Sequence, residues 1–179
     1  MFAEHGFHEA SMNQVADAAG VTKPVLYQHF GSKRALYLEL LEDVGRRLEN
    51  AIGKAVSTAD GPRQQVQAGL SAFFGFVAHD RAAFTLLFAT GAGRGDQELS
   101  ESVRRVEDTI AEYVAALITV DGLSVERRRL LAYGIVGLTE VSSRRWMEHD
   151  VDLDPDVLAA QLAELVWAGL RGIHSPTSR

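Results

Sequence analysis

Side chains of the types that can hydrogen-bond to nucleic acid are closely spaced in residues 22–33 of the 179-residue sequence. Lys23 can reach a phosphate group, and Gln28 can form two hydrogen bonds to the edge of an adenine. Tyr27 and His29 can bond to a phosphate or to a base. These side chains read DNA only if one exposed face of a single element carries them all, so the surrounding elements decide whether this chemistry is available.

The segment SMNQVADAAGVTKPVLYQHFGSK, residues 11–33, predicts two short helices joined by a tight turn. Ser11 begins the first helix as its N-cap, and Gln14 follows at the capping-box spacing. Gly20 stands where a left-handed residue ends a helix. Thr22 is the predicted N-cap of the second helix. Two short helices with a glycine in the turn between them form the helix-turn-helix pattern.

The second helix has two different sides. Leu26 and Phe30 share its apolar side, whereas Tyr27, Gln28 and His29 lie largely on the other side. We therefore expect the polar side to face DNA, with Gln28 reading a base and most of the other groups bonding to phosphates. The predicted DNA-contacting residues are Ser11, Thr22, Lys23, Tyr27, Gln28, His29 and Lys33.

The run VADAAGVTKPVLYQHFGSKRALY resembles the DNA-binding domain of the TetR family of bacterial transcriptional repressors. The family pattern reads A-G-V, then L-Y-x-H-F, then G-S-K-x-x-L, and residues 19–21, 26–30 and 31–36 match it. The resemblance implies an all-α protein with an N-terminal helix-turn-helix domain. It also implies a C-terminal helical domain for ligand binding and dimerisation.

The residues before the helix-turn-helix are few. Residues 1–5 are predicted to be the tail of a helix that Gly6 ends, whereas the resembled family has a full first helix here. We therefore expect the first helix to be largely missing, and Val15, Leu26 and Phe30 to lose an apolar cover. We therefore expect weak operator binding or none.

Composition limits the class of protein. Hydrophobic residues make up 46% and charged residues 23% of the chain, as in globular proteins, and there is no cysteine. Disulfides and thiolate metal sites are therefore excluded, and a cytoplasmic location is expected. No apolar run is long enough for a membrane span. The net charge of −6 is unusual for a protein that binds DNA, and the balance between His8 and Arg34 is only about +1.

Further helices are predicted along the rest of the chain. The turn residues Ser57 to Pro62 give a predicted domain boundary, with a DNA-binding domain and linking helix over residues 1–56 and a second domain over residues 57–179. The loop at residues 91–96 and the last six residues are expected to be mobile. The predicted helices beyond the helix-turn-helix span residues 32–57, 62–90 with a break at His79-Asp80, 97–120, 124–149 and 155–173.

The last two predicted helices are apolar on more than one side, which indicates burial against both their own domain and a partner. We expect a homodimer through these helices, as in the resembled family. Aromatic residues earlier in the domain suggest a pocket for a small, apolar ligand, although a solid aromatic core is the alternative. The predicted ligand-binding residues are Phe73, Phe76, Phe84, Phe88, Tyr113, Glu140, Arg144 and Trp146.

The sequence contains no recognisable catalytic or metal-binding motif. The glycines of residues 91–95 lack nucleotide-loop spacing, and the six histidines are scattered. Glu140 has no matching base, so the sequence predicts no enzyme, cofactor or metal site.

The predicted function is that of a ligand-responsive transcriptional regulator. We expect a cytoplasmic repressor that binds a palindromic DNA operator as a homodimer and that a small apolar molecule releases. Two alternatives stay open. One is a helical small-molecule-binding protein that no longer binds DNA, and the other is a helical enzyme that uses Glu140 or a histidine.

Overall fold

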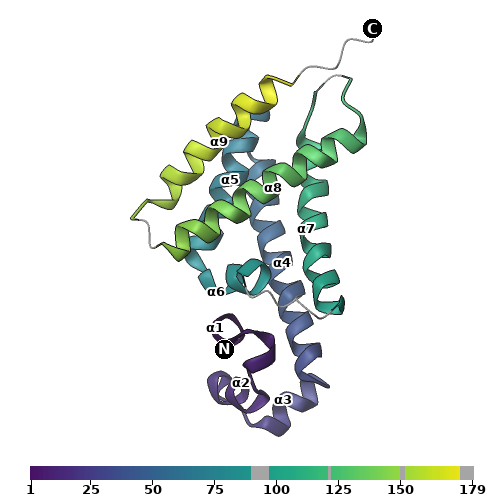
Figure 1. Ribbon diagram of the computed structural model, residues 1–179, viewed down its shortest axis with the longest axis vertical. Coiled ribbons are helices and arrows are strands. Elements are labelled where there is room, and N and C mark those ends of the chain that lie inside the picture. The colour runs from purple at the N-terminus through teal and green to yellow at the C-terminus, as the bar shows by residue number, and fades with distance from the viewer. Residues whose placement is uncertain (90–96, 121, 150–151, 174–179) are drawn as a thin grey trace. The chain divides into compact units, whose positions relative to one another are not determined.

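Helices make up every regular element of the computed structural model, which describes residues 1–89, 97–120, 122–149 and 152–173 (Figure 1). The predicted all-α fold is therefore confirmed. The loop at residues 91–96 and the tail at residues 174–179, both expected to be mobile, lie outside the described residues. None of the described helices is long and apolar enough to cross a membrane.

The helices follow the predicted order closely. One short π-helix, η1, was not predicted. The elements are α1 (Phe2–Glu9), α2 (Met12–Ala19), α3 (Lys23–His29), α4 (Lys33–Ser57), α5 (Pro62–His79), α6 (Arg81–Phe84), η1 (Thr85–Ala89), α7 (Gln97–Leu117), α8 (Val125–Glu148) and α9 (Pro155–Arg171).

The chain divides into two compact units, and each unit takes two segments of the sequence. Unit 1 comprises Met1–Arg47 and Asp80–Val106, and unit 2 comprises Leu48–His79 and Glu107–Arg179. Both α4 and α7 contribute residues to each unit. The predicted boundary between residues 56 and 57 stays a prediction.

Local capping explains where α2 begins and ends. The Ser11 hydroxyl accepts a hydrogen bond from the Gln14 N–H at 3.3 Å, and the Ser11 N–H donates to the Gln14 side chain at 2.8 Å. This is the predicted capping box. Gly20 ends the helix with φ 66°, a left-handed conformation that glycine adopts without strain. The two devices fix the length of the first helix of the helix-turn-helix.

The second helix of the motif differs in two details from its prediction. Thr22 occupies the N-cap position of α3, but its hydroxyl makes no capping hydrogen bond. From the sequence, Gly31 is the residue expected to end this helix. The helix ends earlier, at His29, because Phe30 already has an extended backbone with φ −122° and ψ 110°. The early end leaves residues 30–32 to turn the chain into α4.

Unit 1 packs around the ring of Tyr37, which is fully buried on α4. Phe2 and Phe7 of α1 contact this ring edge-on, each with ring centroids 5.1 Å away. Gly6 interrupts α1 between these two residues with φ 73°, so that both aromatic side chains can reach the same ring. Phe2 and Phe7 are both buried.

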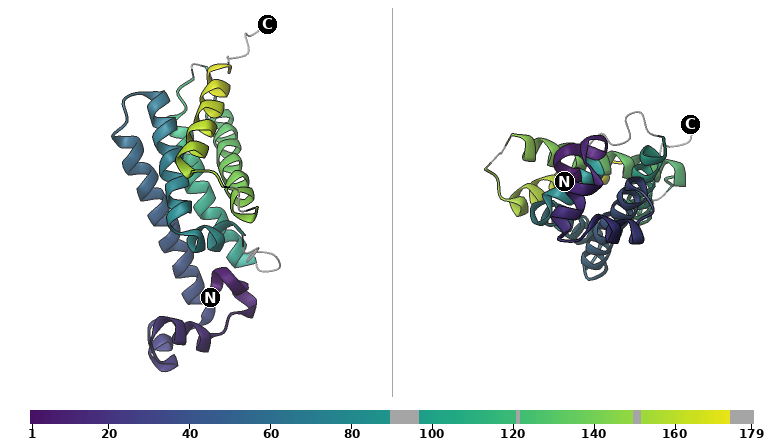
Figure 2. Two further views of the ribbon diagram at one scale, coloured as in Figure 1. Left: turned by 90° about the vertical axis from the view of Figure 1, so that its left-hand side faces the viewer. Right: turned by 90° about the horizontal axis from the view of Figure 1, so that it is seen from below.

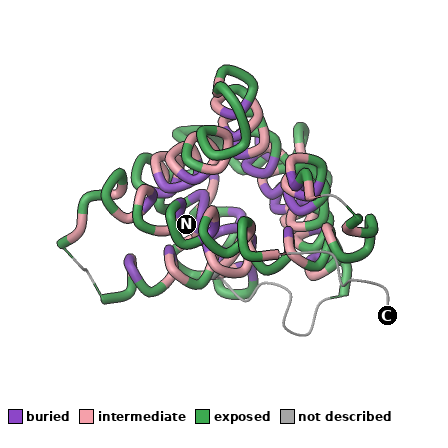
Figure 3. Tube along the Cα trace, turned by 90° about the horizontal axis from the view of Figure 1, so that it is seen from above, coloured by how far each residue is buried: buried purple, intermediate pink, exposed green. Residues whose placement is uncertain are grey.

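Unit 2 is built on α5, which packs mainly along α9 and also contacts α8 (Figure 2). Phe74 of α5 is fully buried and meets Trp146 of α8 at a centroid distance of 6.4 Å. Arg63 and Glu164 join α5 to α9 at the surface with a 2.7 Å ion pair. Buried and exposed residues alternate along the helices of the chain (Figure 3).

Candidate functional site

Helices α2 and α3 follow each other across a short turn (Figure 1), and the polar side chains on both helices are exposed to solvent. Leu26 of α3 is buried, although we expected it to lose its cover, and Phe30 is half-buried. On the other side of α3, Tyr27 is 43% exposed, and Gln28 and His29 are also exposed. Six of the seven predicted contacts are exposed side chains: Ser11, Thr22, Lys23, Tyr27, Gln28 and His29.

Lys33, the seventh predicted contact, is placed differently. Its ammonium group donates hydrogen bonds to the main-chain oxygens of His8 at 3.0 Å and Ala10 at 2.9 Å. The same group lies 4.7 Å from the centroid of the Phe7 ring, a cation–π distance. The side chain is half-buried against α1, which sequence spacing alone could not reveal.

Positive charge on this surface is scarce. Arg34 forms a 2.9 Å ion pair with Glu98, so its charge is offset within unit 1. Lys23 lies 6.0 Å from the Tyr27 ring and forms no ion pair with any carboxylate of the described chain. Lys23 is therefore the main cation that this face offers to a phosphate.

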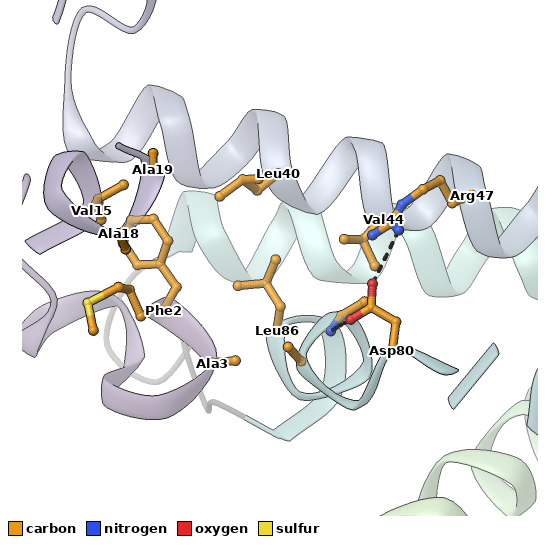
Figure 4. A pocket seen from close by; sticks show the side chains of 13 residues that line it. Phe2, Ala3, Val15, Ala18, Ala19, Leu40, Val44, Arg47, Asp80 and Leu86 are labelled. Carbon is orange, nitrogen blue, oxygen red and sulfur yellow. Dashed lines mark hydrogen bonds and ion pairs between the residues drawn. The ribbon is translucent and has the colours of Figure 1, made fainter. Parts of the chain in front are cut away.

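A cavity of about 380 Å³ lies in unit 1 between α1, α2, α4, α6 and η1 (Figure 4). Its walls are mostly apolar, and an ion pair between Arg47 and Asp80, 3.2 Å long, lies at one end. None of the predicted ligand-binding residues lines it. The lining residues are Met1, Phe2, Ala3, Val15, Ala18, Ala19, Leu40, Val44, Arg47, Asp80, Ala82, Ala83 and Leu86. Val15, which we expected to lack an apolar cover, is half-buried and lines this cavity.

The predicted ligand-binding residues fall into both units. Phe84 and Phe88 belong to unit 1, where their rings contact each other at 5.1 Å. The other six belong to unit 2: Phe73, Phe76, Tyr113, Glu140, Arg144 and Trp146. Within unit 2, Phe73 and Trp146 are buried and Phe76 is half-buried, whereas Tyr113 is exposed.

Three of the predicted ligand-binding residues in unit 2 have polar groups that already have partners. Glu140 and Arg144 form an ion pair one helical turn apart. The Trp146 indole N–H donates to the carbonyl oxygen of Leu153 at 3.1 Å. Ser143, which is not among the predicted site residues, lies on α8 between Glu140 and Trp146. It is fully buried, and its hydroxyl has no hydrogen-bond partner among the residues that the structure describes. The sequence spacing of Ser143 with Thr139 and Trp146, which places all three on one buried side of α8, could have indicated that Ser143 is buried.

Large apolar side chains remain exposed on the last two helices. Leu130 and Val141 of α8 are 71% and 54% exposed, and Leu165 of α9 is 59% exposed. Gly134 and Gly137 lie on α8 with no atom within 4 Å of the place where a Cβ would stand. Isolated exposed apolar residues are common, but several on two successive helices offer apolar area that a partner can cover.

Ionisable groups do not gather into a metal-binding cluster in the part of the chain that the structure describes. No group of three or more His, Asp or Glu residues there could hold a metal ion. The Tyr133 hydroxyl donates a 2.5 Å hydrogen bond to Asp108, which raises the pKa of Tyr133. Both side chains are exposed, and the contact joins α7 to α8 within unit 2.

Comparison with known proteins agrees with this architecture. Residues 1–40 match the family described as bacterial regulatory proteins, tetR family, and residues 62–169 match the tetracyclin repressor-like C-terminal domain. Among relatives, the transcriptional activator FasR of Mycolicibacterium smegmatis is 34% identical over all of this chain and 81% of its own. The transcriptional repressor KstR2 of the same species is 30% identical over 95% of this chain and 85% of its own.

A solved structure supports the same assignment. The TetR-like transcriptional regulator from Rhodococcus sp. RHA1 has a TM-score of 0.77 and 30% identity, covering 96% of this chain and 90% of that one. The family match in both halves, a helix-turn-helix and an all-helical fold therefore agree with the resemblance seen in the sequence. The chain belongs to the TetR family of bacterial transcriptional regulators.

Proposed function

We propose that the protein is a cytoplasmic, homodimeric repressor that binds a palindromic operator and is released by a small apolar molecule. The observation that carries this proposal is the polar face of α3, on which Tyr27, Gln28 and His29 are exposed while Leu26 is buried. A recognition helix needs this arrangement, because its buried side fixes its orientation while its exposed side enters the major groove.

Each exposed group has a proposed part in DNA binding. Gln28 reads an adenine through its side-chain amide, and Thr22 is the second candidate for a base contact. Lys23, Tyr27 and His29 bond to phosphates, which fix the register of the protein on the duplex. Ser11 adds a phosphate contact at the start of α2.

Dimerisation through α8 and α9 is supported by the exposed Leu130, Val141 and Leu165. Such a surface would be covered in a two-fold dimer, the commonest symmetric assembly. Two recognition helices related by this axis would read the two halves of a palindrome.

Ligand binding in unit 2 is supported by the aromatic residues of α5 and α8. The polar groups of Glu140, Arg144 and Trp146 already have partners, so the proposed site offers mainly apolar surface to a ligand. A molecule that binds one arrangement of the dimer better than another shifts the population between them and thereby changes operator affinity. Repression rather than activation is proposed, and both directions occur among relatives, as the names of KstR2 and FasR state.

The scarcity of available cations favours a second candidate function. With Arg34 paired to Glu98 and a net charge of −6, the chain could be a small-molecule-binding protein that no longer binds DNA. Enrichment of duplexes from a random DNA pool by the protein, followed by anisotropy titration of the enriched sequence, separates the two. Tight binding to an enriched inverted repeat supports the regulator. Failure to enrich any sequence at low salt contradicts it.

A further inference from the structure

Lys33 joins two points of the chain that lie far apart in sequence. It is the first residue of α4, and it bonds to the carbonyl oxygen of Ala10, 23 residues earlier. The helix-turn-helix occupies residues 11–32, between these two positions. The hydrogen bond from the Lys33 ammonium group to Ala10 therefore links the two ends of the helix-turn-helix segment.

The carbonyl groups that Lys33 contacts need a partner. Gly6 interrupts α1, so only about one turn of helix follows it. The last carbonyl oxygens of a helix accept no hydrogen bond from an N–H group of the same helix, so they need a donor from elsewhere. Ala10 is buried, so leaving its carbonyl oxygen without a donor would be costly. A lysine at the C-terminal end of a helix supplies hydrogen-bond donors to these oxygens, and its positive charge interacts favourably with the helix dipole.

Phe7 and Ser11 show what this contact holds in place. The Phe7 ring is buried against Tyr37 and lies beneath the ammonium group, which fixes the last turn of α1. Ser11 directly follows Ala10 and caps α2. By holding the carbonyl oxygen of Ala10, Lys33 fixes the point from which α2 starts.

We infer that Lys33 serves DNA binding as a positioning residue, whose ammonium group clamps Ala10 and so sets the orientation of the helix-turn-helix, and that it is not itself a phosphate contact. This inference rests on the proposed DNA-binding function. It changes the part that the sequence suggested for Lys33 and leaves Lys23 as the principal phosphate-binding cation of the motif.

The experiment compares Lys33→Met with the matched control Lys23→Met in the full chain. Both variants lose one ammonium group and keep an apolar stem of similar length. Hydrogen exchange is measured on the free protein at the amides of residues 7–11. Affinity is then measured between low and moderate salt with a duplex that the parent protein has enriched from a random pool.

The two variants should differ in both measurements. Lys33→Met should speed exchange at residues 7–11 about tenfold and weaken DNA binding about tenfold at every salt concentration. Its slope of log affinity against log salt should equal that of the parent. Lys23→Met should leave exchange unchanged and make the slope shallower by about 0.9, the value for one lost phosphate contact.

The opposite pattern overturns the inference. If Lys33→Met leaves exchange unchanged, or makes the salt slope shallower by about 0.9, then Lys33 is a phosphate contact or has no part in positioning. If Lys33→Met does not fold, Phe7→Leu replaces it, because it weakens the same contact from the ring side. If the parent enriches no duplex, the proposed function fails, while the exchange measurement, which needs no DNA, still decides whether the clamp exists.

Discussion

The hydroxyl group of Tyr37 in α4 donates a 3.4 Å hydrogen bond to the main-chain carbonyl oxygen of Leu86 in η1. Both residues are buried, and the Tyr37 ring also contacts Phe2 and Phe7 of α1. One side chain thus connects three elements of unit 1. A π-helix often occurs where a protein needs a local departure from regular geometry, and here η1 presents a carbonyl oxygen to α4.

Tyr37→Phe removes this hydrogen bond and keeps the ring. The free energy of unfolding should fall by about 1 kcal/mol, since the bond is long and a typical buried hydrogen bond contributes about that amount. Urea denaturation followed by circular dichroism measures the change. Tyr113→Phe is the control, because Tyr113 is exposed, and it should have little effect. Equal losses in both variants would show that the Tyr37 hydroxyl has no special role.

Gly45→Ala should destabilise the protein although alanine favours helix. A Cβ at Gly45 would lie 2.8 Å from a methyl carbon of Val106, so the packing must shift. Overpacking of this kind costs about 1–3 kcal/mol. Gly75→Ala is the control, because nothing lies within 4 Å of its Cβ position, and it should stabilise α5 by about 0.5–1 kcal/mol. Thermal unfolding of the two variants should therefore shift in opposite directions.

Gln28→Ala should relax base preference at one position of each half-site, since a bidentate contact to adenine contributes about 1–3 kcal/mol of discrimination. The measurement is anisotropy with the enriched duplex and with single-base variants of it. Lys23→Ala is the matched comparison and should weaken all duplexes alike, with a shallower dependence on salt. Loss of discrimination in both variants to the same degree would mean that the proposed division between base and phosphate contacts is wrong.

Leu165→Glu should dissociate the proposed dimer, because it places a charge on an apolar surface that a partner would bury. Sedimentation velocity at micromolar concentration should show a monomer for this variant and a dimer for the parent. Ala78→Glu serves as control, since Ala78 is exposed on α5 and lies outside the α8–α9 surface. A dimer that survives Leu165→Glu would place the interface elsewhere.

Ser143→Ala should stabilise the ligand-free protein by about 1 kcal/mol, because a buried hydroxyl without a partner carries a desolvation cost that alanine lacks. Thr139→Val is the comparison one turn earlier. The Thr139 hydroxyl bonds to the carbonyl oxygen of Val136 at 2.8 Å, so its removal should bring no such gain. A clear loss of stability in Ser143→Ala would mean that the hydroxyl is satisfied in solution.

Local features of the fold could be predicted from the sequence because their causes lie within a few residues. The Ser11–Gln14 capping box and the left-handed Gly20 were both predicted and are confirmed. Asp154 caps α9 and Pro155 begins it, at the helix position where the missing N–H of proline costs little. The family motif extended these local predictions to the whole fold, since residues 19–36 match a pattern that occurs with one architecture.

Other features depend on contacts between distant residues, which periodicity does not encode. Lys33 has the type and position of a phosphate contact, and only the three-dimensional structure places its ammonium group on Ala10. That the Ser143 hydroxyl lacks a hydrogen-bond partner among the described residues can be known only once the side chains around it are known. The cavity of unit 1 is likewise lined by alanine and other apolar residues from five separate elements, none of which is unusual in its own segment.

The pairing of Arg34 with Glu98 and of Lys33 with α1 also has a kinetic consequence. Non-specific attraction to a chromosome comes almost entirely from lysine and arginine side chains that displace counterions from phosphates. A regulator that uses its cations internally adheres weakly to random sequence and slides over short distances only. We therefore expect it to find its operator mainly by repeated three-dimensional collisions, at a rate that varies little with the potassium concentration of the cell.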